Sequence, residues 1–234
     1  MVEADDGTLL PFRIRLRRRD EPPAEPILAP SGPLLLRRDG ALEAYDREKG
    51  ERRWTWIPRG PVPGKAVRLH SSSAGGSAVA VLDGDGVLRC LDLEGGRELW
   101  TANAGPGRAY DPSSTALLAG DRAVYFVTAD GRSRGGIQVE ARDLLTGAPL
   151  WAAPLSGPPV LVEILPAGPT LIVKYLSAGA GGDGRSGVAV VDRSTGKVVD
   201  RVEDDRLGGE GFEAAAISGV LAVANERVAI VRGR

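Results

Sequence analysis

The fold of this chain is decided by eleven residues, Ala141-Arg-Asp143-Leu-Leu-Thr146-Gly147-Ala-Pro-Leu-Trp151. Their skeleton is an aspartate, a glycine four positions later and a tryptophan four positions after that. The skeleton occurs four times, as Asp46/Gly50/Trp54, Asp92/Gly96/Trp100, Asp143/Gly147/Trp151 and Asp192/Gly196, with Asp200 at the last tryptophan position. Successive aspartates are 46, 51 and 49 residues apart (46 to 92, 92 to 143 and 143 to 192). A period in this range is typical of repeat architectures.

Composition narrows the class of protein. The chain has 234 residues, and 30 Lys and Arg residues against 31 Asp and Glu residues leave a formal net charge of −1. This balance argues against a dedicated nucleic-acid binder and against a polybasic membrane binder. Cys90 is the only cysteine, so the chain can form neither an internal disulfide nor a cysteine zinc cluster. We expect Cys90 to be a small buried residue on a strand.

The hydropathy pattern bears on location. The first seven residues contain no basic segment followed by an apolar one, so they do not resemble a signal peptide. No stretch approaches 18 consecutive apolar residues, the length that a membrane helix requires. We therefore expect a cytoplasmic chain without membrane insertion.

Short apolar runs separated by turn residues predict an all-β chain. Asp39-Gly40 and Asp85-Gly86 are strong hairpin signals. Each period accommodates four short antiparallel strands, which is the size of one blade of a β-propeller. We predict a single domain over 1–234, with blades at residues 26–57, 66–102, 115–153, 160–203 and 212–232, the last one completed by a strand within 8–17.

The N-terminal segment carries both a closure hypothesis and a binding hypothesis. Residues 12–17 alternate strictly between apolar and basic side chains, which predicts a strand with one buried face. Because the fifth predicted blade has only three strands of its own, we expect this strand to complete it and close a five-bladed ring. An open arc that another chain completes is the alternative. The row Arg13, Arg15 and Arg17 is the candidate partner-binding surface, since guanidinium groups bind carboxylates in bidentate pairs; a solvated strand that discourages edge aggregation is the other interpretation.

The repeated stretch resembles the tryptophan-docking motif of quinoprotein-like (pyrroloquinoline-quinone-like) β-propeller repeats. The third copy carries the full pattern from Ala141 to Trp151, whereas Lys49 and Gly95 replace its threonine in the first two copies and Thr195 is kept in the fourth. The resemblance covers most of the chain between the first and the last copy. It implies a propeller fold and does not by itself imply an activity.

The motif residues predict packing rather than chemistry. The aspartate can accept hydrogen bonds from backbone N–H groups of the turn, and the glycine supplies the positive φ that closes it. The tryptophan can lie between neighbouring blades and bury roughly 150–250 Å². Asp200, which stands where the fourth tryptophan would be, therefore predicts a weaker junction between the fourth and fifth blades.

The resemblance implies two kinds of relative. Enzymes of the family bind their quinone with calcium on the propeller axis, beside a vicinal disulfide that a chain with one cysteine cannot form. The other, non-catalytic branch consists of exported scaffold propellers that bind protein partners, although no export signal is evident here. We therefore predict no cofactor, no metal site and no catalytic residue.

Three other segments could carry chemistry, and each has a simpler interpretation. Residues 83–86 contain two aspartates but lack the further ligands of a calcium loop, and they lie where a hairpin turn is predicted. Residues 179–187 are rich in glycine but lack the lysine of a phosphate-binding loop, so we expect a flexible hairpin loop. His70 and the serines at 71–73 lack an orienting third group for nucleophilic catalysis, so we expect a loop histidine.

These observations favour a non-enzymatic β-propeller that mediates protein–protein interaction or sensing within a larger complex. One alternative is a propeller that binds a small polar ligand, such as a glycan or a nucleotide fragment, at its central mouth. A fragment of a quinone-dependent dehydrogenase is the less favoured alternative. An enzyme would need carboxylates that converge on the axis, and the predicted inner strands are largely apolar, with Glu163 and Glu213 as the exceptions.

Overall fold

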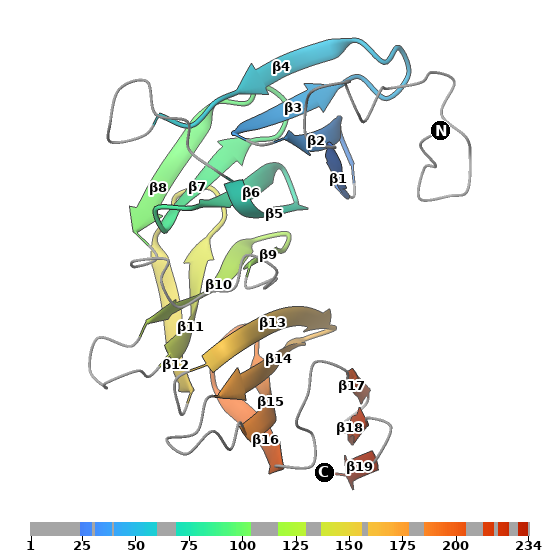
Figure 1. The fold of residues 1–234 in the computed structure, drawn as a ribbon, viewed down its shortest axis with the longest axis vertical. Helices are drawn as coiled ribbons and strands as arrows, with labels where there is room; N and C mark the ends of the chain where they lie inside the picture. The colour runs from blue at the N-terminus through green and yellow to red at the C-terminus, as the bar shows by residue number, and fades with distance from the viewer. Residues whose placement is uncertain are drawn as a thin grey trace. The chain divides into compact units, whose positions relative to one another are not determined.

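The computed structural model describes residues 24–29, 31–38, 40–59, 69–103, 117–129, 137–155, 159–177, 185–204, 213–217, 220–224 and 229–233. All regular elements in these ranges are β-strands (Figure 1). The predicted all-β class is therefore confirmed for the described part of the chain.

The strands form five sheets, and within each sheet consecutive strands are neighbours. The first sheet contains β1 (Glu25–Ile27), β2 (Leu34–Arg38), β3 (Ala41–Tyr45) and β4 (Arg52–Trp56). The second contains β5 (Leu69–Gly75), β6 (Ala78–Asp83), β7 (Val87–Asp92) and β8 (Glu98–Asn103). The third contains β9 (Leu117–Ala119), β10 (Ala123–Ala129), β11 (Ile137–Asp143) and β12 (Pro149–Leu155).

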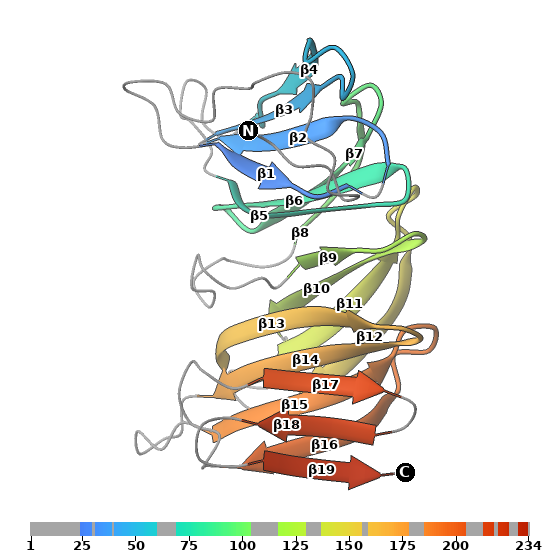
Figure 2. The ribbon, with the colours of Figure 1, turned by 90° about the vertical axis from the view of Figure 1, so that its right-hand side faces the viewer.

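The fourth and fifth sheets complete the described chain. The fourth contains β13 (Pro159–Ala167), β14 (Thr170–Ser177), β15 (Arg185–Asp192) and β16 (Val198–Asp204). The fifth contains β17 (Glu213–Ile217), β18 (Val220–Ala224) and β19 (Ala229–Gly233), which Figure 2 shows side by side. Four-stranded antiparallel blades were predicted, and four of the five sheets have this form. The strand expected within residues 8–17 lies outside the described residues, so ring closure stays a prediction.

The burial of each strand follows its position in the sheet. The second strands are buried along their length, as in β6, where all six residues are buried. The outer strands alternate, as in β4, where Arg53 and Thr55 are exposed and Trp54 and Trp56 are half-buried. A strand covered on both faces has a continuous apolar sequence, whereas a strand with one solvated face alternates.

The chain divides into two compact units. The first comprises Met1–Asn103 together with Ala119–Ala123 and Leu144–Gly147, and the second comprises Ala104–Leu118, Val124–Asp143 and Ala148–Arg234. The first and second sheets thus belong to one unit and the fourth and fifth sheets to the other. The prediction of a single domain over 1–234 stays a prediction, and each unit is described by itself below.

One local prediction is wrong. His70 and the three serines that follow it were expected in a loop, but they lie within β5, paired with β6 (Ser72 opposite Val81). Serine has a weak intrinsic preference for strands, but pairing with the fully buried β6 overrides that preference. Ser73 also accepts a hydrogen bond at its Oγ from the backbone N–H of Ala119, 2.9 Å away, which gives this polar strand a fixed partner.

Candidate functional site

The repeated aspartates organise the turns between the third and fourth strands. Oδ1 of Asp46 accepts hydrogen bonds from the backbone N–H groups of Glu48 and Lys49, both at 2.9 Å. Oδ2 of Asp92 accepts one from Gly95 at 2.7 Å. A carboxylate that follows a strand therefore holds the next three residues in a tight turn.

The fourth copy makes the most complete turn. Oδ1 of Asp192 accepts four hydrogen bonds, from the N–H and the hydroxyl of Ser194 and from the N–H and the hydroxyl of Thr195, at 2.7–3.0 Å. The side-chain bonds from Ser194 and Thr195, followed by the backbone bonds, lower the pKa of Asp192 to about 2. In the first copy the backbone bonds from Lys49 and then Glu48 lower the pKa of Asp46. Both carboxyls are thus held in their charged form by the turn.

The four sheets share a bulge beside the motif. In each, one residue of the fourth strand has no partner on the third strand, directly before the docking position. These residues are Arg53, Leu99, Leu150 and Val199. A bulge increases the local twist and re-aims the side chain that follows it. It therefore prepares the next side chain, which is tryptophan in three copies, to leave the plane of its own sheet.

Each tryptophan docks onto the next copy of the motif along the chain. The indole Nε1 donates to the carbonyl of the residue directly after the next motif's aspartate. The bonds run from Trp54 to Leu93 at 3.2 Å, from Trp100 to Leu144 at 2.9 Å and from Trp151 to Arg193 at 3.0 Å. The acceptor residue is itself anchored, because its N–H donates to the turn before the second strand of its sheet. These bonds join Leu93 to Ser77, Leu144 to Arg122 and Arg193 to Pro169.

The motif glycine is required for two reasons. Gly96, Gly147 and Gly196 have φ values of 67°, 69° and 71°, a region that residues with a side chain rarely adopt. The docked indole also covers them. A β-carbon added at Gly96 would lie 2.6 Å from Cδ2 of Trp54, and at the other two glycines it would lie 2.7 and 2.5 Å from the indoles of Trp100 and Trp151. Only glycine lets the ring approach this closely.

An arginine and a tyrosine reinforce the third of these junctions. The Tyr125 and Trp151 rings lie 5.8 Å apart, and the Arg193 guanidinium lies 5.3 Å from the centre of the Tyr125 ring. Arg193 also donates from Nε to the Tyr125 hydroxyl and from Nη1 to the carbonyl of Gly168. This cation–π pair adds about 0.5–2 kcal/mol to the junction. Sequence reasoning missed it, and the only signal was the position of Arg193 directly after the motif aspartate.

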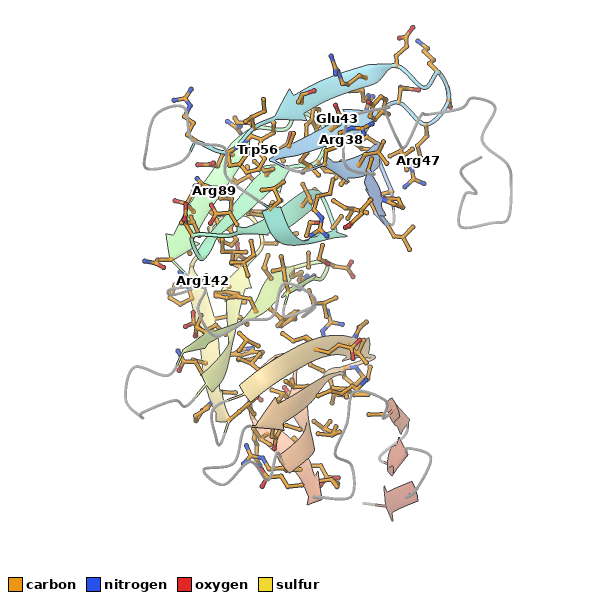
Figure 3. All side chains as sticks on the ribbon, viewed as in Figure 1. Arg38, Glu43, Arg47, Trp56, Arg89 and Arg142 are labelled. Carbon is orange, nitrogen blue, oxygen red and sulfur yellow. The ribbon has the colours of Figure 1, made fainter. Side chains whose placement is uncertain are left out.

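The charged side chains within the sheets pair with one another. Glu43, 5% exposed, accepts a hydrogen bond from Nε of Arg38 at 2.8 Å and one from the Tyr45 hydroxyl at 3.1 Å, and Arg52 lies 3.5 Å away. Figure 3 labels Glu43 and Arg38, which lie next to each other on the first sheet. Burial alone would raise the pKa of Glu43, but these hydrogen bonds and the two arginine charges outweigh it and lower the pKa.

The second and third sheets repeat this pairing with other residues. Arg89 occupies the position of Glu43 in its sheet and lies 3.3 Å from the buried Asp83 and 3.5 Å from Glu98. In the third sheet Glu140 occupies that position, with Arg142 at 3.5 Å. Arg89 and Arg142 are labelled in Figure 3. These charges stabilise individual blades, and sequence reasoning did not single them out because their partners lie on neighbouring strands.

The remaining predicted sites are placed as follows. Asp83 ends β6, and its Oδ1 accepts hydrogen bonds from the N–H groups of Asp85 and Val87, so this segment is the predicted hairpin turn. Glu163 on β13 forms an ion pair with Lys174 at 2.8 Å. The arginine row at 13, 15 and 17, the side chain of Glu213 and most of the glycine-rich loop at 179–187 lie outside the described part.

Cys90 is buried on β7, as expected, and its thiol donates to the carbonyl of Leu144, 3.3 Å away. Burial raises the pKa of the Cys90 thiol to about 12. Two searches restricted to the described residues found nothing: no group of three or more His, Cys, Asp or Glu side chains is arranged to hold a metal ion, and no helix is long and apolar enough to cross a membrane.

Four-stranded antiparallel sheets that follow one another along the chain, with docked turns between them, define a β-propeller. A family model described as "Outer membrane protein assembly factor BamB" matches residues 38–234. The chain therefore belongs to this family of PQQ-like repeat propellers, as the motif predicted. No curated protein sequence matches the chain.

Solved structures agree on the fold. The computationally designed Ika8 protein is 18% identical with a TM-score of 0.58, and the match covers 92% of this chain and 60% of Ika8. A europium-containing methanol dehydrogenase is 15% identical with a TM-score of 0.57, covering 87% and 50%. The WD40 domain of coronin from Toxoplasma gondii is 13% identical with a TM-score of 0.56, covering 89% and 55%. The chain thus spans between half and three fifths of these structures, and the likeness concerns the fold alone.

Proposed function

We propose that this chain is a non-enzymatic propeller that binds a protein partner within a larger complex. The observation that carries the proposal is the family match over residues 38–234, because the matching family is described by an assembly factor. An assembly factor acts through contacts with other proteins. We extend that property to this chain as a hypothesis, because a fold alone does not dictate a function.

The geometry of the blades supports this proposal. The motif aspartates and tryptophans are used in turns and junctions, as in the Asp46 turn and the Trp54 dock. The carboxylate of Glu43 is paired with arginine, and that of Glu163, on an inner strand, is paired with lysine. These side chains are engaged in holding the scaffold together, which leaves recognition to its surface.

We further propose that the arginine row at positions 13, 15 and 17 contacts an acidic surface of the partner. The basis is its sequence, three guanidinium groups at alternate positions of a predicted strand. The cytoplasmic location expected from the sequence is also a proposal, and fractionation of cells with an antibody against the chain would test it.

The test is cross-linking of the full chain in cells of its source, followed by purification and mass spectrometry. We expect one stoichiometric partner, which the R13E/R15E variant loses while its melting temperature is unchanged. The matched control is R18E/R19E, which makes the same charge change beside the row and should retain the partner. A chain recovered without any stoichiometric partner would contradict the proposal, and equal retention by both variants would remove the arginine row from it.

A further inference from the structure

The first copy of the motif has the same acceptor geometry as the copies that receive an indole. Its turn is closed by the bonds from Glu48 and Lys49 to Asp46, and Gly50 has a φ of 70° and donates its N–H to the carbonyl of Asp46 at 2.9 Å. The other three copies each hold a tryptophan over this glycine. The first turn is therefore built to receive an aromatic ring.

The tryptophans of the chain are already used elsewhere. The sequence has four, and Trp54, Trp100 and Trp151 dock on the second, third and fourth turns. The remaining one, Trp56, packs against the core cluster that includes Leu35 and Val79. The first turn must therefore receive a ring of another kind or a ring from another chain.

The sequence before β1 supplies a candidate in the right register. The tryptophans precede the first strand of the next sheet by 15, 17 and 8 residues (54 to 69, 100 to 117 and 151 to 159). Phe12 is the only aromatic residue among residues 1–23 and precedes β1 by 13 residues (12 to 25). Its distance from β1 is within the range set by the docked tryptophans.

The residues after Phe12 also match the pattern that follows a docking residue. After Trp151 the described strand alternates between exposed residues, Ala152 and Pro154, and buried ones, Ala153 and Leu155. After Phe12 the sequence alternates in the same phase, with arginine at 13, 15 and 17 and an apolar residue at 14 and 16. A strand with this pattern presents the docking residue and the apolar residues on one face.

We propose that Phe12 is the docking residue of the first turn, with its ring lying over Gly50 as the indoles lie over Gly96, Gly147 and Gly196. Every residue needed for this contact belongs to the first compact unit. Phenylalanine has no N–H group, so it cannot donate to the carbonyl of Arg47, which occupies the position of the indole acceptors in the other copies. The first dock thus keeps the ring contact and lacks the hydrogen bond.

The inference also bears on the proposed function and, in this respect only, rests on it. If Phe12 faces the first turn, the period of two places Arg13, Arg15 and Arg17 on the opposite side of the strand, where an acidic partner can reach them. The two proposals fail separately. Loss of partner binding in R13E/R15E reads the arginine row, whereas the experiment below reads the position of Phe12 in the isolated chain.

The experiment is NMR spectroscopy of the isotope-labelled full chain, because an aromatic ring over a glycine shifts its Hα resonances upfield. We expect Gly50 to be shifted upfield together with Gly96, Gly147 and Gly196. Gly168 is the control, since it also has a positive φ, 59°, and has nothing within 4 Å of the position that a β-carbon would occupy. In the Phe12→Leu variant only the Gly50 resonances should return to ordinary values.

A second variant tests the same contact by a gain. Phe12→Trp should raise the melting temperature, because the indole can donate to Arg47, whereas Ile14→Trp, on the same face but out of register, should lower it. The proposal is overturned if Gly50 resonates like Gly168 in the wild-type chain. It is also overturned if the Gly50 shift persists in Phe12→Leu, which would identify another ring, for example one from a second copy or a partner, as the occupant.

Discussion

The first two sheets and the last two sheets are joined in different ways. Trp54 crosses from the first sheet to the second, where it covers Gly96 and donates to Leu93, within a core cluster that includes Leu35, Leu91 and Leu93. At the other end, β17 contacts β13 and β14. The cluster there has Ile172, Val188, Val190 and Val202 as its buried members, with Ala214 packed against it.

The docking residue explains this difference. Asp200 occupies the position of Trp54 in the fourth sheet, opposite Val190, and its Oδ1 accepts a hydrogen bond from the N–H of Arg201 in its own strand. The fourth sheet has the Asp192 turn that receives a tryptophan but has no tryptophan to offer. A complete junction therefore needs a ring from one sheet and an Asp–Gly turn from the next, and the two parts vary independently.

The largest effect should come from removing a docked ring. Trp54→Ala should lower the free energy of unfolding by about 3–5 kcal/mol, because the variant loses a large buried side chain and the bond to Leu93. Asp200→Ala should change it by no more than about 0.5 kcal/mol, since no comparable side chain is lost. Urea denaturation of both variants measures the contrast. Equal losses would show that the two junctions do not differ in the way described here.

A paired glycine experiment separates backbone strain from ring contact. Gly196→Ala and Gly168→Ala both place alanine at a positive φ, 71° and 59°, which costs about 1–2 kcal/mol. Only the first also collides with a ring, that of Trp151, so it should cost about 1–3 kcal/mol more. In a Trp151→Ala background the extra cost should disappear. If the gap survives without the ring, docking is not the reason for glycine at this position.

The pH dependence of stability should report the Asp192 turn. The pKa of Asp192 is lowered from its ordinary value of 3.8 to about 2 by the hydrogen bonds from Ser194 and Thr195. A group whose pKa is lower in the folded state stabilises the fold above its unfolded pKa, and this contribution is lost as the pH falls from about 4 towards 2. Asp192→Asn should flatten the melting temperature over this window. The Glu203→Gln variant is a control that removes one carboxyl outside the turns, and an unchanged slope in Asp192→Asn would contradict the assignment.

The smallest effect should be seen in the reactivity of Cys90. Burial raises its thiol pKa to about 12, so the folded chain should react with Ellman's reagent at pH 8 only through opening or unfolding. Trp100 lies opposite Cys90 and shares its acceptor, the carbonyl of Leu144. Trp100→Ala should therefore speed labelling at least as much as its loss of stability predicts, whereas Asp200→Ala should leave the labelling rate unchanged.

Much of the fold could be predicted because its signals are local. The Asp-to-Gly spacing located the turns at 46–50, 92–96 and 192–196, since a carboxylate that caps nearby N–H groups and a glycine of positive φ act within five residues. Continuous and alternating apolar runs located the inner and outer strands. The prediction for His70 and its serines failed because β5 depends on pairing with β6, which is a tertiary preference.

The contacts between sheets could not be predicted in the same way. Nothing adjacent to Leu93 in sequence shows that its carbonyl accepts the indole of Trp54, 39 residues earlier. The pairing of Arg193 with Tyr125, and of Glu43 with Arg38 and Arg52, likewise depends on which strands become neighbours. These contacts decide which charged groups are engaged within the scaffold.

The sequence by itself determined the repeat, the all-β class and the family, because period, turn chemistry and strand alternation are properties of neighbouring residues. Tertiary structure alone decided the direction of docking, the bulge that aims each tryptophan and the second reason for each motif glycine. A glycine can be predicted from its φ, but the ring above Gly96 comes from another sheet. Such close approach exists only once both sheets have folded, because it arises from packing between segments that are distant in sequence.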